Sequence, residues 1–145
     1  MQKSKPFFDE VEIGTEIPPL AIGPVDRNKI IQMAILLKDP NPIHLDRVYA
    51  KERNLPDIIQ QGPFNMASLY RVLTEWLHSP SDINKIHMRL ANNVFPGDRL
   101  TNRGMVKQKY VKDEQNYIVC EIWQENQNGV KTITGEATVI FPIKG

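Results

Sequence analysis

Apolar and polar positions follow a helical period in the first half of this chain and a period of two in the second half. The most strongly patterned helical stretch is "QGPFNMASLYRVLTEWLH", residues 61–78. Gly62 suits the N-cap position and Pro63 the first turn, so the start of this helix is well marked. Its apolar residues cover most of the circumference. The remaining positions form a narrow polar stripe: Asn65, Ser68, Arg71 and Glu75. A helix with this pattern is expected to be surrounded by protein.

Alternation with a period of two begins after residue 82 and predicts four strands, at 83–90, 99–111, 116–123 and 130–141. Short polar segments, "KDEQ" and "QENQNG", separate the last three strands, as is typical of antiparallel hairpins. A short edge strand or ribbon is also predicted within residues 7–20, where Val11 and Ile13 alternate before Gly14. One buried helix followed by an antiparallel sheet predicts an α+β fold in which the sheet curls around the helix.

Two further helices are expected before the central one. Asp26 is a suitable N-cap for a helix in "VDRNKIIQMAILLKD", whose apolar positions include Ile30 and Ala34. The prolines at 40 and 42 prevent this helix from continuing. Asp46 could cap a second, short helix in residues 47–54.

Composition narrows the class of protein. A chain of 145 residues fits a single domain, residues 1–145, and the formal net charge of +1 argues against a dedicated nucleic-acid or anionic-membrane surface. No segment is long and apolar enough to span a bilayer. The single cysteine, Cys120, permits no internal disulfide, favours a packing role in the core and is compatible with a cytoplasmic location.

The segment "DPNPIH", residues 39–44, allows two interpretations. Aspartate, asparagine and proline favour turns, so the segment could be a helix stop in which His44 is a structural residue. Alternatively, Asp39 and His44 could share one water or hydroxyl as an acid–base pair, on a loop stiffened by its prolines. A donor for a developing oxyanion is available at the start of the central helix, where backbone N–H groups are unpaired. Pro63 has no N–H, so the amide of Gly62 is the natural donor.

These residues resemble the Asp-x-Asn-Pro-x-His motif of the MaoC-like hydratases and dehydratases, which include (R)-specific enoyl-CoA hydratases and 3-hydroxyacyl-thioester dehydratase subunits. The resemblance covers nearly the whole chain. "FFDEVEIGTEIPP" is similar to the opening segment of that family, "QQGPFNMASL" to the start of its central helix, and "MRLANNVFPGDRL" to its strand and "PGD" turn.

The resemblance implies a hot-dog fold and reversible hydration of a trans-2-enoyl thioester to an (R)-3-hydroxyacyl thioester, a lyase reaction of fatty acid metabolism. It implies that Asp39 and His44 are catalytic, that the Gly62 amide binds the thioester oxygen, and that Asn41 supports the loop. No metal or separate cofactor is expected, because coenzyme A or acyl carrier protein enters as part of the substrate. A homodimer, or a heterodimer with a related hot-dog chain, is expected.

Four positions depart from the pattern common in that family. This chain has Leu37-Lys38 where many members have Ser-Gly, Gln61 where many have histidine, and Asn65 in place of a serine. These departures leave the choice of acyl chain and of carrier open. The main alternative is a non-catalytic subunit of a heteromeric dehydratase, although such a subunit would be expected to have lost the Asp–His pair. A hot-dog thioesterase is a third interpretation, but those enzymes do not generally carry this loop.

Overall fold

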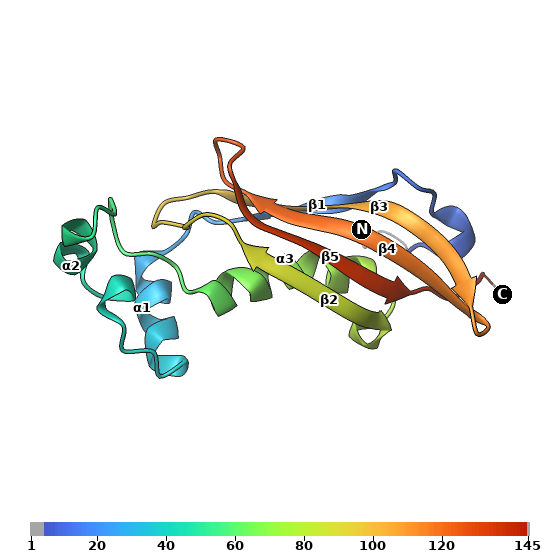
Figure 1. The fold of residues 1–145 in the computed structure, drawn as a ribbon, viewed down its shortest axis with the longest axis horizontal. Coiled ribbons are helices and arrows are strands. Elements are labelled where there is room, and N and C mark those ends of the chain that lie inside the picture. Colours follow the sequence, from blue (N-terminus) through green and yellow to red (C-terminus); the bar gives the residue numbers. More distant parts are fainter. Residues whose placement is uncertain (1–4, 145) are drawn as a thin grey trace.

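The computed structural model describes residues 5–144 as a five-stranded antiparallel sheet that curves over one long helix (Figure 1). In the sheet the strands follow the order β1-β3-β4-β5-β2, so β1 and β2 form its edges. Every neighbouring pair is antiparallel. The predicted α+β class is therefore confirmed. The strands are β1 (Glu16–Ile22), β2 (Ile83–Leu90), β3 (Leu100–Lys112), β4 (Gln115–Glu125) and β5 (Lys131–Ile140).

The first strand differs from its prediction. Val11 and Ile13 precede the strand instead of belonging to it, and a short 3₁₀ helix occupies Phe8–Glu10. Strand β1 starts after Gly14 and contains both Pro18 and Pro19, with an irregularity in its register against β3 between Ile17 and Leu20. Prolines donate no hydrogen bond, and this edge position tolerates them because one side of the strand has no partner in the sheet.

The long helix under the sheet is α3, Gly62–Trp76. Its N-cap is Gln61, one residue earlier than predicted, so Gly62 and Pro63 occupy the first two helical positions. There the missing N–H of proline costs nothing, because the first amides of a helix have no partner within it. The helix packs its apolar face against β3, β4 and β5. The core cluster includes Leu69, Val72, Leu73, Trp76, Val106, Ile118, Cys120, Ile122 and Val139.

The predicted polar stripe of α3 divides into two parts. Arg71 and Glu75 are exposed and form an ion pair at 2.6 Å. Asn65 and Ser68, in contrast, are buried. The carbonyl of Ser68 accepts a hydrogen bond from the side chain of Asn102 on β3 at 2.7 Å. Burial of Ser68 is tolerated because the sheet supplies its hydrogen-bonding partner, and burial of Asn65 because Gln60 does.

Two shorter helices lie beyond the end of the sheet where α3 begins (Figure 1). Helix α1, Arg27–Leu36, is capped by Asp26, whose carboxylate accepts from the amide of Asn28 at 2.8 Å. Helix α2, Arg47–Glu52, is capped by Asp46. Both predicted caps are confirmed. Between these helices the chain carries the 37–46 segment, which is thereby placed near the N-terminus of α3. Within residues 5–144, no helix is long and apolar enough to cross a membrane.

Candidate active site

Asp39 owes its position to the way α1 ends. Lys38 adopts a left-handed conformation with φ of 51°, and its amide donates to the carbonyl of Ile35 at 3.1 Å. The amide of Asp39 then donates to the carbonyl of Ala34 at 2.9 Å. These two bonds make up a Schellman motif, in which Asp39 is the second residue after the C-cap Leu37. The helix terminus therefore fixes the backbone of Asp39.

The next turn is held by side chains of the motif itself. A carboxylate oxygen of Asp39, Oδ1, accepts from the amide of Asn41 at 3.2 Å. Asn41 in turn caps the short 3₁₀ helix Pro42–His44, because its Oδ1 accepts from the amide of Ile43 at 3.1 Å. Consecutive turns of this kind bring His44 back toward Asp39.

His44 is 8% exposed, and its two ring nitrogens have different neighbours. Nδ1 lies 2.7 Å from the carbonyl oxygen of Ile59. Because a carbonyl can only accept, Nδ1 carries a hydrogen. In the neutral imidazole, Nε2 is therefore an acceptor, and it lies 3.5 Å from Oδ2 of Asp39. The structure thus brings the two predicted residues together with a defined orientation of the ring.

Gly62 lines the same small pocket as His44. This pocket has a volume of about 150 Å³ and is also lined by Gln60, Asn65 and Leu90. Because Gly62 is the first residue of α3, its N–H has no partner within the helix. A Cβ at this position would lie 2.6 Å from Cδ1 of Leu90, so a larger residue would have to displace that side chain. Asp39 is not among the residues that line the pocket; its contact with the site is through His44.

The segment before α3 ties the loop to the rest of the molecule. Asp57 accepts a hydrogen bond from Arg27 of α1, and Arg47 of α2 lies 4.0 Å from the same oxygen. Burial raises the pKa of Asp57, but hydrogen bonds from Arg27 and from the Ile58 amide, with the charges of both arginines, outweigh it, so the pKa lies below its usual value. Because Asp57 contacts both helices, it holds the two sides of the 37–46 segment together.

Gln60 and Asn65 are pocket residues that the sequence did not single out as chemical. Gln60 donates from Nε2 to Oδ1 of Asn65, and both side chains are buried. Sequence reasoning noted Asn65 only as part of a polar stripe and as a departure from the family pattern. The run of two glutamines before Gly62 was a signal, because uncharged polar residues at the buried start of a helix require partners.

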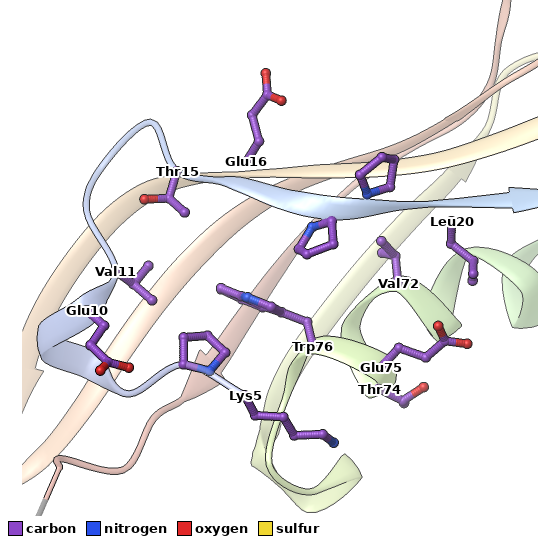
Figure 2. Close-up of a pocket in the computed structure, with 13 residues that line it drawn as sticks. Lys5, Glu10, Val11, Thr15, Glu16, Leu20, Val72, Thr74, Glu75 and Trp76 are labelled. Atoms are coloured by element: carbon purple, nitrogen blue, oxygen red, sulfur yellow. The ribbon is translucent and has the colours of Figure 1, made fainter. Parts of the chain in front are cut away.

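A larger cavity lies elsewhere. It has a volume of about 710 Å³ and runs between the N-terminal segment, β1 and the second half of α3 (Figure 2). Trp76 projects from α3 into this space, toward β1 and Val11 (Figure 2). None of the predicted catalytic residues lines it. Across residues 5–144, no group of three or more His, Cys, Asp or Glu side chains is arranged to hold a metal ion.

Comparison with solved structures gives the fold. The chain superposes on R-hydratase PhaJ1 from Pseudomonas aeruginosa with a TM-score of 0.80 and 23% identity, over 95% of this chain and 86% of that chain. The ChsH1-ChsH2 complex from Mycobacterium tuberculosis gives a TM-score of 0.73 and 24% identity, over 90% of this chain and 98% of that chain. A MaoC-like dehydratase from Rhodospirillum rubrum gives a TM-score of 0.83 and 21% identity, over 96% of this chain and 98% of that chain. The predicted hot-dog fold is confirmed.

Sequence comparison gives the family. Fatty acid synthase beta subunit hexB from Dothistroma septosporum is 29% identical over 118 residues, which is 79% of this chain and 6% of that protein. The fatty acid synthase subunit beta of Saccharomyces cerevisiae is 29% identical over 112 residues, 72% of this chain and 5% of that protein. The chain therefore spans a small fraction of these long relatives. The model of the MaoC like domain matches residues 10–127. With more than half of its length matched, this chain belongs to the MaoC-like hydratase and dehydratase family.

Proposed function

We propose that this protein is a hydro-lyase that reversibly hydrates a trans-2-enoyl thioester to an (R)-3-hydroxyacyl thioester. The observation that supports this most directly is the approach of His44 Nε2 to the carboxylate of Asp39 at 3.5 Å, on a loop whose backbone is fixed at both ends. The R-stereochemistry is carried over from the structural likeness to an R-hydratase. The acyl carrier is either coenzyme A or acyl carrier protein.

The orientation of His44 suits activation of water. Nδ1–H donates its hydrogen bond to the carbonyl of Ile59, so Nε2 is an acceptor, as is the Asp39 carboxylate. One water can therefore donate a hydrogen bond to each of them. The water oxygen forms the bond to Cβ of the enoyl group while one of its protons passes to the pair. The pair returns a proton to Cα, so the net change is the addition of one water. No electron transfer occurs, and the reaction requires no redox cofactor.

The Gly62 amide is assigned to the thioester oxygen. Attack at Cβ moves electron density onto the thioester carbonyl and gives an enolate-like oxygen. A donor at the N-terminus of α3 stabilises that charge, because its N–H is unpaired and the helix dipole is positive there. Gly62 and His44 line one pocket of about 150 Å³, so one substrate can reach both. Asn41 supports this arrangement indirectly by capping the turn that carries His44.

The competing function is that of an accessory subunit in a heteromeric dehydratase. It is favoured by the likeness to the ChsH1-ChsH2 complex, in which two different chains assemble. An accessory chain has no need for an ordered Asp–His pair, and this chain keeps both residues within 3.5 Å of each other. Catalysis by this chain itself is therefore the better-supported proposal.

Assembly with a second hot-dog chain, identical or related, is part of the same proposal. In a single chain β2 is an open edge of eight residues without proline, whereas the other edge is interrupted by Pro18 and Pro19. Large apolar side chains near the candidate site are also exposed, among them Leu36 at 75% and Val48 at 66%. We expect the second chain to pair along β2 and to cover this apolar surface.

The proposed activity is tested by the purified chain alone with crotonyl-CoA, followed by loss of the enoyl absorbance. Turnover that gives the R-product, identified by chiral separation of the released acid, is the expected result. If the chain is inactive alone but active after addition of a related hot-dog subunit, the accessory function is correct. If there is no turnover in either case, with crotonyl-CoA or the corresponding acyl carrier protein thioester, the hydro-lyase proposal is wrong.

A further inference from the structure

We infer that the side chains of Gln60 and Asn65 form the inner wall of the catalytic pocket and restrict the substrate to short acyl groups of about four carbons, an inference that rests on the proposed hydration. The wall begins with one contact, the hydrogen bond from Nε2 of Gln60 to Oδ1 of Asn65. Both residues line the pocket that also contains His44 and Gly62. An acyl chain that extends inward from the reacting carbons therefore meets these two amides.

The wall is anchored to the fold. Gln60 is 7% exposed and Asn65 3%, so neither is a mobile surface side chain. The backbone amide of Gln60 donates to the carbonyl of Val94 at 2.8 Å, and the amide of Asn65 donates within α3 to the carbonyl of Gln61 at 3.1 Å. Displacing the wall would leave two buried amide groups without partners, which costs about 1–3 kcal/mol for each group.

A second cavity, of about 300 Å³, shares Gln60 with the catalytic pocket. Its remaining lining comes from one face of α3, which includes Phe64, Ala67 and Ser68, and from the end of β1, the segment that follows it and Lys29 of α1. The catalytic pocket alone, at about 150 Å³, is smaller than the roughly 300–1,000 Å³ typical of ligand sites. A pocket of this size suits a short acyl chain better than a long one.

The wall therefore predicts discrimination by chain length. One methylene that a pocket cannot accommodate costs about 10–200-fold in kcat/KM. A six-carbon chain would have to displace the Gln60–Asn65 hydrogen bond, whereas a four-carbon chain would not. Removing both side chains joins the catalytic pocket to the second cavity without leaving either amide unpaired, because the partners are lost together.

The experiment measures kcat/KM with trans-2-enoyl-CoA substrates of four, six and eight carbons. For the wild-type protein we expect a fall of about tenfold or more from four to six carbons. In Gln60→Ala/Asn65→Ala the eight-to-four-carbon ratio should rise at least about tenfold. Asn65→Ser, a smaller change, should raise the same ratio in the same direction. Gln32→Ala/Asn128→Ala is the matched control, because it makes the same two truncations at exposed positions.

Binding of the saturated butanoyl-CoA and octanoyl-CoA, measured by calorimetry, tests the wall independently of turnover. The wild-type protein should bind butanoyl-CoA more tightly, and the double variant should lose that preference. Equal kcat/KM for four and eight carbons in the wild-type protein would overturn the inference, as would an unchanged ratio in both folded variants. Absence of turnover with every substrate, combined with a preserved binding preference, would refute the hydratase proposal and leave the wall in place.

Discussion

Removal of one member of the Asp39–His44 pair should abolish most of the turnover while leaving the fold intact. Asp39→Asn and His44→Gln are each expected to lower kcat by about 10²–10⁴, the range for a positioned acid or base. If the two residues act on one water, the double variant should be little worse than the worse single variant, because groups acting as a unit are not additive.

The structure sets the accompanying changes in stability. The Asp39 side chain is 37% exposed, and asparagine keeps an oxygen that can accept from the Asn41 amide, so we expect a loss of less than about 0.5 kcal/mol. His44→Gln loses the 2.7 Å bond from Nδ1 to Ile59, at a cost of about 1 kcal/mol. In a chain of this size that corresponds to about 2–4 °C in Tm.

The His44→Asn variant distinguishes the structural role of Nδ1 from the catalytic role of Nε2. The side-chain amide of asparagine can take the place of Nδ1–H opposite Ile59, but no atom replaces Nε2. The melting temperature of His44→Asn should therefore be closer to the wild-type value than the melting temperature of His44→Gln is. Both variants should have equally low kcat. Enoyl absorbance with crotonyl-CoA gives kcat, and thermal unfolding gives Tm. If Asp39→Asn and both His44 variants are folded and turn over at the wild-type rate, the pair is only a helix stop and the catalytic assignment is wrong.

Four further outcomes follow from the same structure. Gly62→Val should remain folded, because the added Cβ meets the half-exposed end of Leu90, and should show a marked fall in kcat; wild-type kinetics would remove this amide from the mechanism. Asp57→Asn should lose about 1–2 kcal/mol at pH 7 in denaturant unfolding. The pKa of Asp57 is lowered in the folded protein, so its contribution to the free energy of unfolding is present above the ordinary value of 3.8 and is lost as pH falls through the folded pKa. The stabilities of the wild-type protein and Asp57→Asn should therefore converge in acid. A stability difference that stays constant with pH would contradict this. Burial raises the pKa of Cys120 to about 12, so a thiol reagent at pH 8 should modify it only after unfolding; rapid reaction of the native protein would show that the core opens there. Light scattering at micromolar concentration should give twice the monomer mass, or a complex with a related chain when one is present; a stable monomer in both cases would contradict the proposed pairing along β2.

Local sequence signals were sufficient for most of the fold. The alternation in 99–141 placed β3, β4 and β5, and a two-residue turn at Asp113 and Glu114, both with positive φ, joins the first pair. Asp26 and Asp46 were recognisable as caps because capping depends on neighbouring residues only. The boundary of β1 could not be placed in this way. Its strand character comes from pairing with β3, which overrides the two prolines inside it.

The interior of the site depended on contacts that the sequence does not show. Asn65 and Ser68 were recognised only as members of a polar stripe. The pattern does not show that Asn102 on β3, which lies 34 positions from Ser68 in the chain, provides the hydrogen bond that makes burial of Ser68 favourable. The wall formed by Gln60 and Asn65 was not anticipated either, because its meaning depends on which cavities it lines. Asp39 and His44 were found because their motif is local and its spacing is short.

The two interpretations of the 39–44 segment describe one structure. Lys38 ends α1 in a left-handed conformation, and the bond from the Asp39 amide to Ala34 completes the helix stop. The same bond fixes the backbone from which the Asp39 carboxylate projects toward His44. Ile43 and Ile59 then lock the other end, because the Ile59 amide donates to the Ile43 carbonyl at 3.1 Å while the Ile59 carbonyl accepts from His44. The turn is held by backbone bonds on both sides and by Oδ1 of Asp39, which accepts from the Asn41 amide. It therefore preorganises the pair without using Oδ2 of Asp39 or Nε2 of His44, and these two atoms stay available to a substrate.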